Sequence, residues 1–173
     1  MPTLSSKASE PLSFLAKIDR VEINHTTERD GVVYYVLDVF LGVARHASQR
    51  SRRPRPLPVA GPITKLERRF NDFADLRYQV WSYAQRKHEG SCTGCKYCDE
   101  FMSYIVHSMS QARLFVKLTT GVDTRKKLMT TFCNEFIDLT LGSRSEPRPR
   151  SFECDSIQAI PYLVHRFFEK ENA

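Results

Sequence analysis

The sequence predicts an α+β fold in which a small three-stranded antiparallel sheet packs against a helical subdomain. Segments rich in β-branched and aromatic residues come first in the chain, and apolar residues at helical spacing follow them. No helical pattern separates one strand from the next, so the alternation that builds a parallel sheet is missing. With 173 residues, 41% of them hydrophobic, the chain is long enough to bury one core.

Three strands are expected. Alternating apolar residues over 14–23 change phase near Arg20, which indicates a strand with a bulge. The run over 32–43 follows Asp30-Gly31, a turn signal, so these two strands predict a hairpin. A third strand is expected over 63–70.

Four helices are expected after the strands. Asn71 or Asp72 caps the first, which runs to about residue 86. The others cover about 101–109, 124–141 with a stop at Gly142, and 156–169, where Pro161 must lie in the first turn or bend the helix. Residues 110–122 are typical of a loop.

The expected organisation is a flexible N-terminal segment over 1–12, one domain over 13–142, and a linker with a C-terminal helix that packs on the domain over 143–173. Within the domain, residues 44–62 collect arginines and prolines and form a basic, proline-rich loop insertion.

Charge and composition limit the partners and the cellular location that the sequence is compatible with. The formal net charge is +6 and the pI is near 9.2, so an anionic partner is expected: nucleic acid, a phosphorylated lipid surface or an acidic protein. The first ten residues show no secretory pattern, which favours the cytosol. No apolar run approaches the roughly 20 residues of a spanning helix, so any membrane contact is expected to be peripheral. Five cysteines, an odd number, favour thiols or a metal over a disulfide framework.

The segment "ERRFNDF", residues 67–73, places two arginines where a strand passes into a helix. Strand alternation puts Arg68 and Arg69 on opposite faces, so they cannot share one role. A structural interpretation gives Arg69 an ion pair with Glu67 or Asp72, and Arg68 a structural role such as pairing with Asp75. A functional interpretation makes Arg69 an anion ligand, because a guanidinium donates bidentately to phosphate oxygens.

These residues resemble a known family. "RRFNDFADL" is similar to the Arg-Arg-(Tyr/Phe)-x-x-Phe-x-x-Leu pattern of the PX (phox homology) domain, which binds phosphoinositides on endosomal and related membranes. "VDTRKKLMTTFCNEFI" resembles a later helix of that family, and the expected order of elements agrees over 14–141. The resemblance therefore implies a PX-like fold for the domain.

The resemblance also implies site residues. Arg69 would contact the phosphate at the 3-position of the inositol ring, Phe70 would lie beneath the ring, and Arg125 would hold the ring hydroxyls. A lysine of the family falls at Ala112, for which Arg113 or Lys117 could substitute. The neighbouring Leu114 and Phe115 are expected to dip into the membrane interface.

"HEGSCTGCKYC", residues 88–98, offers His88, Cys92, Cys95 and Cys98 as soft ligands at short spacing. The same spacing also suits one face of a helix, where cysteine acts as a small hydrophobe, and this is the favoured interpretation, with no metal or cofactor predicted. Cys133 is expected to pack inside a helix, and Cys154 carries no signal.

The sequence thus predicts a phosphoinositide-binding module that recruits the chain to membranes. Phosphatidylinositol 3-phosphate on endosomes is the expected ligand, and the chain is expected in the cytoplasm. The alternative is a PX-like scaffold with weak or no lipid binding, which binds a protein through loop 44–62 or the cysteine-rich helix. We expect no enzyme, because no nucleophile has a credible base, and no nucleic acid, because no aromatic-bearing RNA-binding motif is found.

Overall fold

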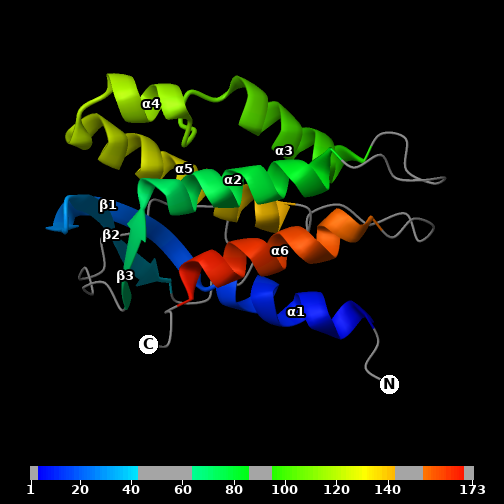
Figure 1. Ribbon diagram of the computed structural model, residues 1–173. Coiled ribbons are helices and arrows are strands. Elements are labelled where there is room, and N and C mark those ends of the chain that lie inside the picture. The colour runs from blue at the N-terminus through cyan, green and yellow to red at the C-terminus, as the bar shows by residue number, and fades with distance from the viewer. Residues whose placement is uncertain (1–3, 43–63, 86–94, 143–153, 170–173) are drawn as a thin grey trace, which may run out of the picture.

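The computed structural model describes residues 4–42, 64–85, 95–142 and 154–169, and Figure 1 shows how they are arranged. The predicted loop 44–62, the linker after 142, and both His88 and Cys92 lie outside these residues. The elements in chain order are α1 (Leu4–Leu15), β1 (Ile18–Arg29), β2 (Val32–Leu41), β3 (Thr64–Arg69), α2 (Phe70–Ala84), α3 (Lys96–His107), α4 (Leu114–Thr119), α5 (Val122–Gly142) and α6 (Asp155–Phe168).

The predicted α+β fold is confirmed: the strands form one antiparallel sheet in the order β1-β2-β3, and the helices pack beside it. The hairpin turn is Asp30-Gly31, where both residues have positive φ, 51° and 73°. Such a turn matches the right-handed twist of its strands, which is why Asp-Gly signals it. A register shift between Ile18 and Arg20 confirms the irregularity expected there.

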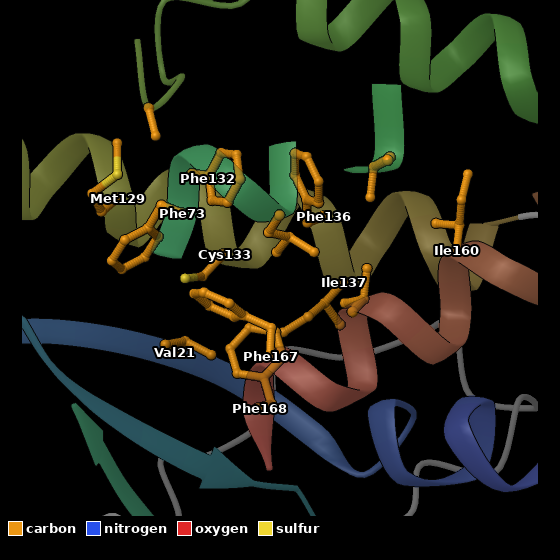
Figure 2. Close-up of a cluster of buried hydrophobic side chains, with 14 of the residues drawn as sticks. Val21, Phe73, Met129, Phe132, Cys133, Phe136, Ile137, Ile160, Phe167 and Phe168 are labelled. Carbon is orange, nitrogen blue, oxygen red and sulfur yellow. The ribbon is translucent and has the colours of Figure 1, made fainter. Parts of the chain in front are cut away.

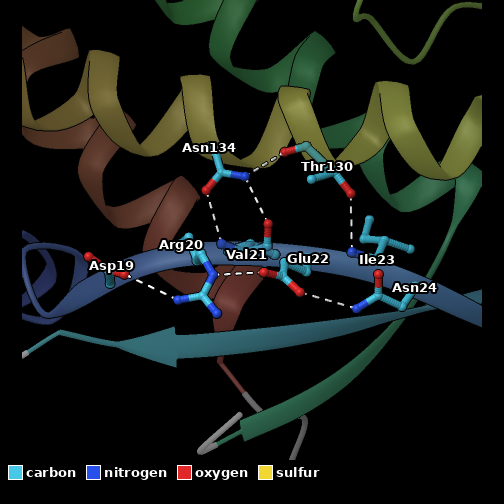
Figure 3. Close-up of polar contacts among 8 residues, drawn as sticks. All are labelled: Asp19, Arg20, Val21, Glu22, Ile23, Asn24, Thr130 and Asn134. Atoms are coloured by element: carbon cyan, nitrogen blue, oxygen red, sulfur yellow. Dashed lines mark hydrogen bonds and ion pairs between the residues drawn. The ribbon is translucent and has the colours of Figure 1, made fainter. Parts of the chain in front are cut away.

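The outer edge of β1 is covered by α5 (Figure 3). The side-chain amide of Asn134 donates to the carbonyl of Val21 at 2.8 Å, and its oxygen accepts from the Val21 N–H at 2.9 Å. Thr130 Oγ1 accepts from the Ile23 N–H at 3.1 Å. Two side chains on one helix face therefore replace a missing neighbouring strand, which satisfies the backbone and blocks edge pairing.

The core lies between the sheet and helices α2, α5 and α6 (Figure 2). Phe73 of α2 is fully buried at its centre, with its ring centroid 6.0 Å from Tyr35 of β2, 6.0 Å from Phe132 of α5 and 5.1 Å from Phe167 of α6. These edge-on contacts join four elements through one residue. They fix the start of α2, and with it the β3–α2 junction.

Two helices were not predicted. Residues 1–12 were expected to be flexible, whereas α1 begins at Leu4, and its buried Leu12 and Leu15 belong to a helix that packs on α6. The predicted strand over 14–23 accordingly begins only at Ile18. A six-residue helix, α4, replaces part of the predicted loop 110–122. Helices this short have weak signals of their own, because tertiary packing supplies most of their stability.

The remaining helix predictions hold with shifted ends. Helix α2 begins at Phe70, before the predicted caps, and α3 begins at Lys96 rather than near residue 101. Pro161 lies inside α6, beyond its first turn.

Candidate functional site

Arg69 ends β3 and caps α2. Its backbone N–H donates to Asp72 Oδ2 at 2.6 Å, and its Nη2 lies 3.1 Å from Asp72 Oδ1. The ion pair with Asp72 that the structural interpretation proposed is therefore present. The Arg69 side chain is still 54% exposed, so solvent and ligands can reach the guanidinium.

Arg68 faces the opposite side, as strand alternation predicted. It is buried, and its guanidinium donates to the carbonyls of Phe167 at 3.0 Å and Glu169 at 2.7 Å. These carbonyls lie at the C-terminal end of α6, where a cation also interacts favourably with the helix dipole. Arg68 is structural, as expected, but its partners are carbonyls and not Asp75.

A second cation lies at the start of α2. Lys117 Nζ, from α4, contacts Asn71 Oδ1 at 3.1 Å and lies 6.0 Å from the ring centroid of Phe70. Phe70 itself is buried and belongs to the core, while Ala112, the position of the family lysine, is buried too. Of the two substitutes considered from the sequence, Lys117 is the one beside Phe70.

Arg113 has a different environment. Its Nη2 donates to the carbonyls of Ile105 and Val106, both at 2.7 Å, and so satisfies the last turn of α3. It also lies close enough to Arg77 to act on it: burial, and then the charge of Arg113, lower the pKa of Arg77. The contacts of Arg113 are therefore those of a helix cap.

Arg125 lies in the first turn of α5 and is half-buried. Burial raises the pKa of Tyr35, and the charge of Arg125 acts on that pKa in the opposite direction, so the two side chains are neighbours. Tyr35 is opposite Arg68 in the β2–β3 ladder, and Tyr34 is opposite Arg69. Arg125 is therefore a neighbour of Tyr35, whose ladder partner Arg68 faces the side opposite Arg69. Its Nε is buried without a hydrogen-bond partner in the described part of the chain.

An apolar surface lies on α4, the helix that carries Lys117. Four large hydrophobic side chains on and before α4 are mostly solvent-exposed: Met109 (75%), Leu114 (69%), Phe115 (67%) and Leu118 (74%). We call these four residues the α4 apolar surface. Leu114 and Phe115, which the sequence analysis expects to dip into the membrane interface, are exposed, as such a contact would require. The signal that the sequence offered for the helix itself was a cluster of apolar residues in an otherwise polar stretch.

Two of the cavities in the described part of the chain are lined by residues of the sheet and the helices. One of about 400 Å³ is lined by β3, α2 and α6, with Arg68, Asp72, Asp75 and Arg166 among its walls. A second, of about 300 Å³, is lined by residues such as Phe14 and Phe168. Asp72, the ion-pair partner of Arg69, is among the walls of the first cavity, whereas Arg69, Phe70, Lys117 and Arg125 line neither of these two.

The cysteines of the described residues are mostly buried. Cys133 packs in the core between α5 and its neighbours, as predicted. Burial raises the pKa of the Cys98 and Cys133 thiols, which makes them poor nucleophiles. Cys154, which carried no signal in the sequence, lies in contact with Cys98.

Comparison with family models, with curated proteins and with solved structures finds no match for this chain. The resemblance to the PX family therefore stays a prediction that depends on the quoted motifs. Among the described helices, none is both long and apolar enough to cross a bilayer.

Proposed function

We propose that this chain is a PX-like module that binds a phosphoinositide headgroup, phosphatidylinositol 3-phosphate in the first instance, and thereby attaches peripherally to endosomal membranes. The observation that carries the proposal is the α4 apolar surface beside Lys117, the cation that contacts the start of α2. Exposed apolar side chains next to cations suit the interface of an anionic bilayer.

Within this proposal the α4 apolar surface enters the lipid interface. Helix α4 buries Val116 on one side and exposes Leu114, Phe115 and Leu118 on the other, so insertion needs no unfolding of the helix. Exposed apolar groups of this kind mark interaction surfaces when they gather in one place. Lys117 on the same helix would stay at the level of the lipid phosphates, because a long cationic side chain can reach outward from an apolar surface.

The headgroup would bind at the β3–α2 junction, between Arg69, Lys117 and Arg125. An exposed ion pair such as Arg69–Asp72 is worth only about 0.2–1 kcal/mol, so little free energy is lost when the guanidinium leaves Asp72. A phosphate can therefore take the guanidinium from Asp72. The N-terminus of α2, with the positive end of its helix dipole, also favours the negative charge of a phosphate.

Vesicle sedimentation at fixed salt tests the proposal. Vesicles carry either phosphatidylinositol 3-phosphate or another phosphoinositide of equal charge density, and the variants are Arg69→Ala and Lys117→Ala. Each variant is expected to weaken the headgroup-selective part of vesicle binding by about ten- to a hundredfold, the equivalent of one lost charge-assisted contact. Melting temperatures should stay near that of the wild type, because both side chains are exposed.

Lys17→Ala is the matched control. It removes the same charge from an exposed residue next to Ile18, whose partner Leu41 is at the end of β2 far from the Tyr34–Arg69 pair. It should alter only the salt-sensitive, nonspecific component. Equal loss in all three variants, or a wild type without headgroup preference, would refute the proposal and favour the protein-binding scaffold.

A further inference from the structure

Three cysteines from two distant segments converge in the fold. The Sγ atoms of Cys95, Cys98 and Cys154 all lie within 4.8 Å of one another, and those of Cys98 and Cys154 are 3.5 Å apart. Cys98 and Cys154 are buried, while Cys95 is half-buried. The cluster is separate from the proposed headgroup site, and nothing argued below depends on lipid binding.

The sulfur separations fit metal ligation. A covalent S–S bond is about 2.05 Å long, so Cys98 and Cys154 at 3.5 Å are not a disulfide. Zinc holds thiolates at about 2.3 Å in a tetrahedron, which places two ligand sulfurs about 3.8 Å apart. The separations in this cluster, from 3.5 Å to at most 4.8 Å, lie around that value.

All three cysteines lie at the start of a helix. Cys95 caps α3, Cys98 lies in the first turn of the same helix, and Cys154 caps α6. The positive ends of two helix dipoles therefore meet at the cluster, where they favour the negative charge that the sulfurs carry once a metal is bound. A buried anchor fixes one of these helix starts: Ser156 Oγ donates to the Tyr83 carbonyl, near the end of α2, at 2.9 Å.

We propose that Cys95, Cys98 and Cys154 bind a structural Zn²⁺ ion that ties the start of α3 to the start of α6. Each thiol gives its proton to solvent when its sulfur binds the metal, so three thiolates donate to one ion. Both helices pack on α2, and the metal would add a direct link between them. The described residues supply three of the four ligands of a tetrahedral site.

Metal analysis of the full chain tests the site. The chain is purified under reducing conditions without chelator, and zinc is quantified by mass spectrometry. We expect a single zinc ion per chain, and its loss in Cys98→Ser and in Cys154→Ser. Cys133→Ala is the control, because Cys133 is equally buried but outside the cluster, and it should keep the metal.

Cobalt substitution provides a readout on the wild type, which holds even where a serine variant fails to fold. Co²⁺ added to the metal-free chain should give the thiolate-to-metal absorption bands of a tetrahedral site, and Zn²⁺ should displace them. A folded wild type that takes up neither ion overturns the proposal. It is also overturned if Cys154→Ser retains zinc as the wild type does, or if peptide mapping of the freshly reduced and purified chain finds a Cys98–Cys154 disulfide.

Discussion

Asn134→Ala gives the most direct test of how the helical half is attached to the sheet. The variant removes both hydrogen bonds between the Asn134 amide and the backbone of Val21 (Figure 3). Each is worth about 0.5–1.5 kcal/mol, and the freed N–H and C=O are partly buried. Against that loss, alanine is a better helix former than asparagine by about 0.5 kcal/mol. We therefore expect a net loss of about 2 kcal/mol.

Urea unfolding followed by circular dichroism measures this loss, with an unchanged m-value as evidence that the end states are the same. A loss of that size corresponds to a melting temperature lower by about 4–8 °C in a chain of this length. Hydrogen exchange gives the local readout. The Val21 amide should exchange faster in the variant, because the Asn134 side chain is its hydrogen-bond acceptor.

Thr131→Ala is the matched control for Asn134→Ala. Thr131 lies on the exposed side of α5, and its hydroxyl donates only to the Lys127 carbonyl within the helix. The gain in helix propensity is similar, so this variant should be neutral or slightly stabilised. A loss below about 0.5 kcal/mol for Asn134→Ala, or unaltered exchange of the Val21 amide, would refute the argument that side chains of α5 serve as the missing strand.

The remaining predictions concern charge, the lipid interface and pH. Asp72→Asn keeps an acceptor for the Arg69 N–H but removes the carboxylate charge that pairs with the Arg69 guanidinium, so headgroup affinity in vesicle sedimentation should rise by up to about fivefold; a lower affinity would contradict the proposed role of Arg69. Leu118→Glu places a charge in the α4 apolar surface and should abolish vesicle binding without lowering the melting temperature, whereas unaltered binding would exclude insertion of α4. Burial raises the pKa of Tyr104 to about 12, from about 10 in the unfolded chain. The contribution of this shift to the free energy of unfolding is therefore complete below pH 10 and is lost between pH 10 and 12. Thermal melts of Tyr104→Phe should show a shallower decline over that window; an unchanged pH profile would contradict this assignment.

The sequence predicted the hairpin and the β3–α2 junction because their signals are local. Asp30-Gly31 has the two positive φ angles that its composition indicates, and alternation along β3 correctly separated Arg68 from Arg69. The short helices α1 and α4 escaped prediction because burial against other elements decides them, and a single segment does not record that burial.

The two candidate sites also differ in whether their signals are local in the chain. One local motif pointed to Arg69 and a second to Arg125, whereas only the fold shows that Lys117, rather than Arg113, lies beside Phe70. The cysteine cluster could not be found in this way, since Cys154 joins Cys98 across a separation of 56 residues. The sequence offered His88 and Cys92 as partners because they are near in the chain, whereas folding supplied a third sulfur from α6. A metal there would act on the packing of α3 and α6, while the residues proposed to bind the headgroup belong to β3, α4 and α5. Chelation should therefore lower the melting temperature yet leave the phosphoinositide preference of the folded chain intact, and a chelator that abolished that preference at a temperature where the chain stays folded would show that the two sites are coupled.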